Sequence, residues 1–519
     1  MARRRAKPTG RNRSRASPPA LRVAKNLLDK QRFDEALVKF NEAVRAAPND
    51  LSVLIGASRA LGAHYKIDRS RALLERALRL GARRHEVQWA VGESYRMLGQ
   101  LSAAEACYRR ACQLANDPRS QLELAKICER RHRLDEARLL VQQVLRQAPR
   151  SSAAHLLTAR IARRSGETAK AETILHEVIA AASQDPTVVA EAWGELATLL
   201  DSAGEYDAAW NAILACKHQL IGRDQAQRSA SDFVLARCRR MVEAITADHF
   251  TRWQMSAKKF SPRRVALLTG FPRSGTTLLE QLLDAHPKVV CSEEKDVFST
   301  DIFPSLGAGR PPDTPIEQML DELSYETILD QRERYLDTME AIFGEPIGKR
   351  LHLDKNPPMI LMIPAMKRLF PELKLILALR DPRDVVLSCF LRYLPLNPVS
   401  VCFLTIERTC DRYLLDMQAW LKIREMISGA WVEIRYEDAV EDLKREARRA
   451  LETLELPWDD GVLNYRDRTM QKQVLSPTYE AVAQPIYRSA MGRWKNYQQQ
   501  LGPILENLAP VVRALGYGD

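Results

Sequence analysis

A repeat of 34 residues in the first half of the chain is the feature that most restricts its fold. Ala36, Phe40 and Ala43 form a small–large pattern at helical spacing. The pattern recurs after 34 residues, after another 34, and then with small shifts, at Ser70, Leu74 and Ala77; Ala104, Tyr108 and Ala111; Ala137, Val141 and Val144; Ala171, Leu175 and Val178; and Ala209, Ile213 and Cys216. Small residues let two antiparallel helices approach closely and stack on the next pair. The period therefore predicts an α-solenoid of six helix pairs.

Turn residues keep the same phase as the repeat. Pro48 and Pro149 close their units, whereas Gly99, Gly166 and Gly204 separate the two helices of theirs. The pattern resembles tetratricopeptide repeats over residues 21–218, and its best match is Gly92, Tyr95, Gly99, Ala104, Tyr108 and Ala111. The resemblance implies a concave groove that binds a peptide or a partner protein. The alternative is a rigid scaffold or a surface for forming a homodimer.

Length and charge define the rest of the chain's organisation. A chain of 519 residues exceeds the size of one hydrophobic core, so two domains are expected, and 45% hydrophobic with 28% charged residues is typical of a soluble globular protein. Seven basic residues in the first twenty supply over half of the net charge of +12. Residues 1–20 are therefore predicted to be a solvated, disordered basic tail, and nucleic acid is not an expected partner.

Two absences in the sequence set further expectations. No apolar run follows the basic start or reaches the length of a membrane span, which predicts a cytoplasmic protein without a membrane segment. The nine cysteines are scattered and contain no C-x-x-C pair. They are expected to be reduced, buried thiols, and no structural metal is predicted.

The composition changes after the repeats. Residues 219–262 are predicted to be a helical cap, with a helix over 231–245, and a linker. Short β-type runs then alternate with helical patterns in a second domain, 263–519, with expected strands at 265–269, 351–353, 373–379 and 431–435. Near-continuous apolar strands of this kind predict an α/β domain with a parallel sheet covered by helices on both faces.

The first of these strands runs directly into a loop of the phosphate-binding type. Residues 270–277 read GFPRSGTT, the G-x-x-x-x-G frame of a P-loop, and an amphipathic helix follows at 278–284. Backbone N–H groups at such a helix N-terminus bind anions. Thr276 stands where a nucleotide triphosphatase has its lysine, and the cation is Arg273 instead. Because γ-phosphoryl transfer uses that lysine with a metal-binding aspartate, the loop is expected to hold another phosphate ester.

A second anion motif follows about a hundred residues later. Residues 377–388 read LALRDPRDVVLS, so that a strand delivers Arg380 at its carboxyl end and a helix carries Ser388 two turns further on. Both side chains can reach one phosphate. The two motifs together resemble the sulfotransferases that use 3′-phosphoadenosine 5′-phosphosulfate (PAPS). The resemblance implies a 5′-phosphosulfate site at Arg273, Ser274, Gly275, Thr276 and Thr277, and a 3′-phosphate site at Arg380 and Ser388.

A third segment adds to this resemblance. Residues 487–497, YRSAMGRWKNY, resemble the C-terminal segment with which the family closes over its nucleotide, although the Arg-Lys-Gly of the cytosolic class is missing before Gly492. The expected nucleotide contacts there are Arg488, Arg493, Trp494 and Lys495. Tyr436, after the last strand, is included with them, and its alternative role is packing at the strand end.

The resemblance also implies catalytic roles. The segment 272–287, the CSEE run at 291–294 and the DKNP run at 354–357 look most like protein-tyrosine sulfotransferases and bacterial repeat-bearing sulfotransferases. Glu294 aligns with the family's base, and Lys355 aligns with the lysine that stabilises the leaving phosphate. Arg273 would assist in catalysis, and Thr478 stands where the protein-tyrosine enzymes have a serine near the transferred group. Their alternative readings are a solvated loop carboxylate for Glu294 and a surface lysine for Lys355.

These observations predict an enzyme that transfers a sulfonate group from PAPS, without a metal, to an acceptor hydroxyl. The expected acceptor is a tyrosine in a polypeptide held by the repeats. Two alternatives stay open: sulfation of a saccharide or small metabolite, and a catalytically decayed scaffold that binds a nucleotide without turnover. A kinase is disfavoured, because the P-loop lysine is missing.

Overall fold

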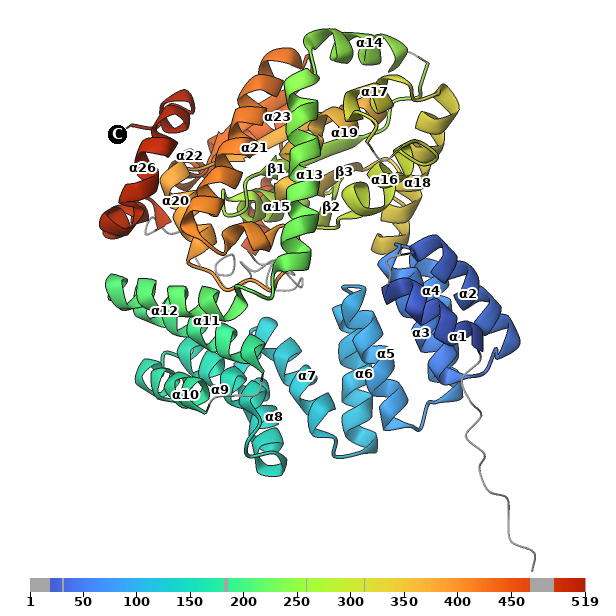
Figure 1. Ribbon diagram of the computed structural model, residues 1–519, viewed down its shortest axis with the longest axis vertical. Helices are drawn as coiled ribbons and strands as arrows, with labels where there is room; N and C mark the ends of the chain where they lie inside the picture. The colour runs from blue at the N-terminus through green and yellow to red at the C-terminus, as the bar shows by residue number, and fades with distance from the viewer. Residues whose placement is uncertain are drawn as a thin grey trace, which may run out of the picture. The chain divides into compact units, whose positions relative to one another are not determined.

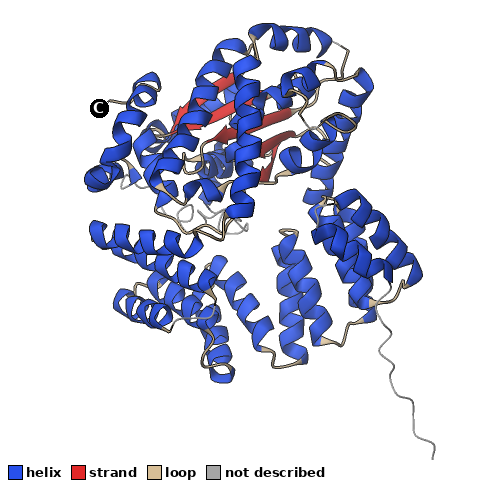
Figure 2. Cartoon of the chain, in the orientation of Figure 1, coloured by secondary structure: helices blue, strands red, loops and turns tan. Residues whose placement is uncertain are grey.

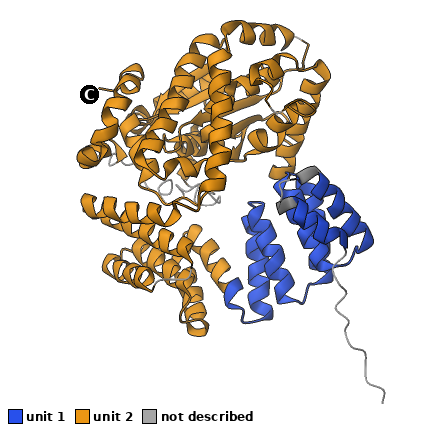
Figure 3. Ribbon diagram, in the orientation of Figure 1, with its two compact units in different colours: residues 1–120 blue, residues 121–519 orange. Residues whose placement is uncertain are grey.

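The computed structural model describes residues 19–29, 32–181, 185–257, 259–311, 313–466 and 490–518. The chain divides into two compact units, residues 1–120 and 121–519 (Figure 3). Among the described residues, helices alone occupy the first part of the chain, and strands occur only between residues 265 and 435 (Figure 2). An α-solenoid is therefore followed by an α/β domain, as the sequence predicts.

The repeats form helix pairs whose recurring positions make the core. The helices are α1 (Pro19–Asp29), α2 (Phe33–Ala46), α3 (Leu51–Ala63), α4 (Ile67–Leu80), α5 (His85–Met97), α6 (Leu101–Leu114), α7 (Pro118–Arg130), α8 (Leu134–Gln147), α9 (Ser152–Arg164), α10 (Thr168–Ala180), α11 (Pro186–Ser202) and α12 (Tyr206–Leu220) (Figure 1). All eighteen recurring residues lie on the even-numbered helices and are at most 3% exposed. The period thus identifies the second helix of each pair and its buried face.

The turns inside five of the six pairs, those that the structure describes, contain a residue with a left-handed backbone. Gly99, Gly166 and Gly204 have φ values of 70°, 80° and 84° between the two helices of their units, as the turn signals predict. Tyr65 and His132 occupy the matching turns of two other units with φ values of 52° and 58°. The turn geometry therefore recurs even where the sequence supplies no glycine, although a side chain there is strained.

The α/β domain contains a five-stranded sheet in which all neighbouring strands are parallel. Its order is β2-β3-β1-β4-β5, and the strands are β1 (Val265–Gly270), β2 (Val289–Glu293), β3 (Leu351–Lys355), β4 (Lys374–Leu379) and β5 (Trp431–Arg435). The four strands expected from the sequence are present. The prediction missed β2, a strand of only five residues at the sheet edge that ends in Ser292 and Glu293.

Longer and shorter helices connect and cover these strands. They are α13 (Gln225–Ala244), α14 (Ala247–Ala257), α15 (Thr276–Asp284), α16 (Phe303–Leu306), α17 (Ile316–Asp321), α18 (Tyr325–Phe343), α19 (Ile363–Leu369), α20 (Pro382–Phe390), α21 (Ile406–Met426), α22 (Tyr436–Glu441), α23 (Leu443–Thr453) and α26 (Gln498–Ala514). Short helical turns are η1 (Phe298–Ile302), η2 (Pro357–Met362), η3 (Ser400–Phe403), η4 (Asp460–Asn464) and η6 (Arg493–Tyr497).

Helices lie on both faces of the sheet. On one face, α15 and α23 bury their leucines and alanines against alternate strand residues such as Leu353 and Ile434. The neighbouring strand residues point the other way, as the pleat requires. There, Tyr335 of α18 donates a hydrogen bond to Asp354 at 2.6 Å, and Trp420 of α21 donates one to Glu433 at 2.6 Å. The predicted two-sided cover is present.

The helix expected at 231–245 is α13, which begins six residues earlier. It packs against α17 and α21, and its Cys238 and Met241 are 1% exposed. The helix therefore belongs to the core of the α/β domain, whereas the sequence suggested a cap on the repeats.

The remaining expectations concern thiols, metals and membranes. All nine cysteines are free thiols, and eight of them are buried, as expected. The described residues bring together no group of three or more metal-ligating side chains. None of the described helices combines the length and the apolar character needed to cross a bilayer.

Candidate active site

The predicted site residues collect at one edge of the sheet. The loop 270–277 follows β1, Glu294 follows β2, Lys355 ends β3, Arg380 follows β4 and Tyr436 follows β5. All five strands are parallel, so their carboxyl ends share this edge. In open α/β sheets, ligands bind at the carboxyl ends of the strands. The sheet topology thus explains why residues far apart in the sequence meet.

The loop after β1 has the backbone of an anion cradle. Gly275 has φ 97° and caps α15, and a Cβ there would lie 2.9 Å from the ring of Tyr436. Gly270 has φ 154°, and a Cβ there would lie 2.4 Å from the carbonyl oxygen of Ala378. Arg273 also has a left-handed backbone, with φ 74°. These conformations turn the chain sharply into α15, whose N-terminal N–H groups can bind an anion.

The two predicted anion motifs are joined in one hydrogen-bonded cluster. Nε of Arg273 donates to Oγ of Ser388 at 3.2 Å, and Nη1 of Arg380 donates to the carbonyl oxygen of Arg273 at 3.2 Å. The guanidinium of Arg380 lies 5.3 Å from the ring centroid of Tyr436. Nε of Arg380 is buried, and no group among the described residues accepts from it. A buried donor of this kind fits an anionic ligand such as a phosphate.

Lys355 is buried between two carboxylates. Its Nζ lies 2.6 Å from Oε1 of Glu294 and 3.0 Å from Oε2 of Glu280. Lys355 and Glu280 are fully buried, whereas the side chain of Glu294 is 36% exposed. Burial alone would lower the pKa of Lys355, but the two carboxylates outweigh it and raise that pKa above its usual value. Lys355 therefore stays charged, and Glu294 is the member of the cluster that can meet an acceptor.

Glu280 was missed by the sequence reasoning. It lies on α15, where leucines surround it in the sequence, and its side chain is completely buried. The available signal was a glutamate four residues after Thr276, on the helix face that begins at the loop; once buried, such a carboxylate needs a cationic partner. Its partner could not be identified without the position of β3.

Asp384 is a second functional residue that the sequence reasoning missed. Helix α20 begins at an Asp-Pro pair, where Oδ1 of Asp381 accepts from the backbone N–H of Arg383 at 2.9 Å. One turn on, the buried Asp384 accepts from the backbone N–H groups of Gly492 at 2.7 Å and Trp494 at 2.8 Å. Burial raises the pKa of Asp384. The signal was its position four residues after Arg380.

Of the C-terminal segment predicted to contact the nucleotide, Trp494 lies beside α20, whereas the side chains of Arg493 and Lys495 do not join the cluster around Arg380. The guanidinium of Arg383 stacks on the ring of Trp494, 4.2 Å from its centroid. Nη2 of Arg493 donates to Oδ1 of Asp201 in α11 at 2.5 Å, and the side chain of Lys495 is exposed. Thr478 and Arg488 lie outside the described residues. Their predicted roles, like the other assigned roles, stay predictions.

The three small residues of the cradle are all buried. Ser274 and Thr276 are 3% exposed and Thr277 is 8% exposed. Thr276 begins α15, so its backbone N–H belongs to the helix N-terminus that faces the loop. The three residues thus lie at the buried turn between β1 and α15, and their role in binding a 5′-phosphosulfate stays a prediction.

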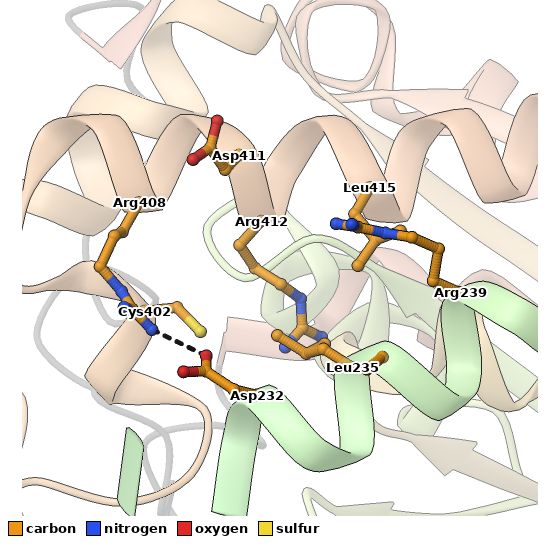
Figure 4. A pocket seen from close by; sticks show the side chains of 9 residues that line it. Asp232, Leu235, Arg239, Cys402, Arg408, Asp411, Arg412 and Leu415 are labelled. Carbon is orange, nitrogen blue, oxygen red and sulfur yellow. Dashed lines mark hydrogen bonds and ion pairs between the residues drawn. The ribbon is translucent and has the colours of Figure 1, made fainter. Parts of the chain in front are cut away.

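A separate cavity of about 300 Å³ lies between α13 and α21 (Figure 4). None of the predicted site residues lines it. Arg408 is paired with Asp232 at 3.0 Å, and Arg412 is paired with Asp416 at 3.0 Å. Two of the three arginines that line the cavity are thus paired with carboxylates, unlike Arg380 of the edge cluster, whose buried Nε has no acceptor among the described residues.

The fold and the edge cluster define a parallel α/β domain with a candidate anion site beside the ion pair of Glu294 and Lys355. Comparison with known proteins specifies its class. Residues 266–460 match the sulfotransferase family, and residues 55–120 and 130–190 match tetratricopeptide repeats. The chain therefore carries a sulfotransferase domain preceded by tetratricopeptide repeats.

Two protein-tyrosine sulfotransferases match about half of this chain. Protein-tyrosine sulfotransferase A of Caenorhabditis elegans is 27% identical over 48% of this chain and 66% of its own length. Protein-tyrosine sulfotransferase 2 of Gallus gallus is 28% identical over 48% of this chain and 68% of its own. An uncharacterized protein of Aquifex aeolicus is 25% identical over 60% of this chain, but the chain spans only 40% of that protein.

Solved structures give weaker matches. The sulfotransferase domain from the curacin biosynthetic pathway is 18% identical, with a TM-score of 0.32, over 50% of this chain and 99% of its own. MamA is 16% identical, with a TM-score of 0.27, over 30% of this chain and 92% of its own. These scores are low, so the class rests on the family matches and the sheet topology.

Proposed function

We propose that this chain transfers a sulfonate group from PAPS to the hydroxyl group of a tyrosine in a polypeptide. The observation that carries the proposal is the pairing of Glu294 with Lys355 at 2.6 Å, at the sheet edge that also carries Arg273, Arg380 and Ser388. Sulfonate transfer needs a base for the acceptor and cations for the leaving phosphate. The edge cluster supplies both.

The residues at the edge suit the two ends of the donor. The buried Nε of Arg380, which has no acceptor among the described residues, suits the 3′-phosphate together with Ser388. The backbone N–H groups at the start of α15, with Arg273, Thr276 and Thr277, suit the 5′ group. When bound, PAPS supplies an activated S–O bond to the 5′-phosphate.

The chain's own groups then have distinct tasks. Glu294 takes the proton of the attacking hydroxyl as the new O–S bond forms. Lys355 stabilises the negative charge that grows on the 5′-phosphate oxygen as the old S–O bond breaks, and adenosine 3′,5′-bisphosphate leaves. The ion pair between Glu294 and Lys355 loosens for this step, and the buried Glu280 keeps Lys355 charged while it does so.

Three findings support a polypeptide acceptor. The relatives named above are protein-tyrosine sulfotransferases, and tetratricopeptide repeats typically bind peptides or proteins. The side chain of Glu294 is partly exposed, which suits an acceptor that arrives from solvent. A saccharide or small-metabolite acceptor is the alternative, with the repeats serving oligomerisation.

The most informative experiment is a transfer assay with labelled PAPS and tyrosine peptides, glycans and small phenols as parallel acceptors. Sulfated peptide is the expected product. In Glu294→Gln, turnover should fall by about 10²–10⁴-fold, the usual contribution of a general base, with near-normal affinity for adenosine 3′,5′-bisphosphate. Glu293→Gln is the matched control, and its turnover should stay close to that of wild type.

The other outcomes are equally specific. Sulfated glycan or phenol without sulfated peptide would identify the alternative acceptor class. Binding of adenosine 3′,5′-bisphosphate with no product from any acceptor would identify a decayed scaffold. Unchanged turnover in Glu294→Gln would remove Glu294 from the mechanism.

A further inference from the structure

The last tetratricopeptide repeat contacts the C-terminal segment 490–497 directly. Asp201, at the end of α11, accepts a hydrogen bond from Nη2 of Arg493 at 2.5 Å and another from Oη of Tyr497 at 2.8 Å. Two aromatic residues of α12 complete the contact, since the ring centroids of Tyr206 and Trp210 lie 5.3 Å and 6.1 Å from that of Tyr497. One carboxylate of the repeat thus holds both ends of η6.

The same repeat also packs on the end of α20, the helix that carries Ser388. Nζ of Lys217 in α12 donates to the carbonyl oxygen of Arg392 at 2.7 Å and lies 5.6 Å from the ring centroid of Phe390. Lys217 is 3% exposed, and burial lowers its pKa to about 8. The ring of Trp210 lies 4.9 Å from that of Phe390. Lysines on the surface of an independent repeat are normally exposed, whereas Lys217 is buried and hydrogen-bonded to the α/β domain. The last repeat is therefore packed against that domain.

The segment 490–497 is held from its other side by the anion site. Arg380 donates through Nη2 to the carbonyl oxygen of Ala490. Asp384 accepts from the backbone N–H groups of Gly492 and Trp494. The segment therefore lies between the repeat, through Asp201, and the predicted 3′-phosphate site, through Arg380.

We propose that Asp201 is a positioning residue of the donor-nucleotide site, and that the last repeat is part of that site. This inference rests on the proposed function, because it takes PAPS as the donor. The hydrogen bond from Arg493 to Asp201 fixes the backbone of the segment 490–497. This backbone holds Trp494 against Arg383 and the carbonyl oxygen of Ala490 against Arg380. Arg493 therefore acts on the nucleotide site indirectly. When such a segment is already ordered in the free protein, less conformational entropy is lost on ligand binding, and the affinity is higher.

Charge and positioning predict opposite effects, which makes the proposal testable. Removing the negative charge of Asp201 near an anion site would by itself strengthen anion binding. Loss of positioning would weaken it. Asp207, on the same repeat, is the matched control, because its carboxylate accepts from the side chain of Gln500 at 2.5 Å in α26, outside the segment 490–497.

The test uses the full chain and adenosine 3′,5′-bisphosphate as the calorimetric probe. In Asp201→Ala, the Kd should rise by about 10-fold, as expected for the loss of a charge-assisted hydrogen bond. Asp201→Asn retains an acceptor oxygen and should recover most of the affinity. Asp207→Ala should leave the Kd unchanged or slightly lower. In turnover, Asp201→Ala should raise the KM for PAPS while kcat at saturating donor stays near wild type.

Each contrary result has a separate meaning. A purely structural role for Asp201 would lower the thermal midpoint and the active fraction without changing the Kd, and this result would overturn the inference alone. Equal Kd values for Asp201→Ala and Asp207→Ala would also overturn it. If the wild-type chain does not bind the probe at all, the proposed function fails together with the inference.

Discussion

At the residue scale, the charge state of Lys355 depends on a partner from another element. Glu280→Gln removes one of its two carboxylates, so the pKa of Lys355 should fall and the alkaline limb of the kcat profile should move to lower pH. Turnover at pH 7 should fall by about 10-fold, equivalent to ~1.4 kcal/mol of transition-state stabilisation. Asp284→Asn, on the same helix, is the control. A pH profile identical to that of wild type would show that Glu280 has no effect on Lys355.

Two buried groups on β3 oppose each other in the pH dependence of stability. Burial raises the pKa of Asp354 to about 6 and lowers that of His352 to about 3. Between about pH 4 and 6 the folded chain holds a proton on Asp354 that the unfolded chain has lost, so this group makes stability fall as pH rises. His352 acts in the opposite sense, because the unfolded chain binds the proton there. The two slopes cancel over this range.

Asp354→Asn should therefore expose the slope of His352. The amide that replaces the carboxyl group cannot ionise, but it can still accept the hydrogen bond that Tyr335 donates to Asp354 in the wild-type chain at 2.6 Å. Relative to wild type, the variant should gain on the order of 3 kcal/mol in unfolding free energy between pH 4 and pH 7, from a shift of about two pKa units. Urea unfolding at several pH values measures this gain. An equal difference at both pH values would contradict the assigned protonation of Asp354.

At the element scale, the left-handed residue in the described turns of the repeats limits the stability of the helix pairs. A Cβ at Gly166, with φ 80°, would meet no atom within 4 Å, so Gly166→Ala tests backbone strain alone. It should destabilise the chain by about 1 kcal/mol. Gly56→Ala, inside α3, should stabilise it by about 0.5–1 kcal/mol, because its Cβ finds ordinary contacts at 3.6 Å and 3.7 Å. Urea midpoints that shift in the same direction for both variants would exclude this explanation.

The same turns show why part of each element was predictable. Gly99, Gly166 and Gly204 indicated their turns from the sequence alone, because glycine adopts positive φ without strain. Tyr65 and His132 gave no such signal, because their φ values are imposed by the helices on each side. Strand β2 was missed because its sequence, VVCSE, has neither the alternation of apolar and polar residues seen in β5 nor a continuous apolar run of four residues.

At the scale of the whole molecule, the last repeat and the α/β domain are not independent, because side chains of the repeat contact the domain directly. Deleting residues 1–218 removes Asp201, Trp210 and Lys217, which contact Arg493, Phe390 and the carbonyl oxygen of Arg392. We expect this deletion to lower the thermal midpoint of the remaining chain strongly and to impair even a small acceptor. Deleting residues 1–120, the first compact unit, should preserve both the midpoint and turnover of a small acceptor.

Thermal unfolding and turnover of a small phenol measure the two deletions side by side. If the repeats hold the polypeptide acceptor, the shorter deletion should still reduce turnover of a peptide. Similar midpoints for both deletions would show that the last repeat contributes little to the stability of the α/β domain.

The sequence by itself determined the features that depend on neighbouring residues. These are the helix pairs, four of the five strands, the loop 270–277 and the Arg380–Ser388 motif, because periodicity, turn residues and short motifs act over a few positions. The tertiary structure alone decided which charges pair when they lie far apart in the sequence. Glu280 meets Lys355 across α15 and β3, and Asp201 meets Arg493 at a separation of 292 residues. A buried charge selects its partner by distance in space, which no local pattern records.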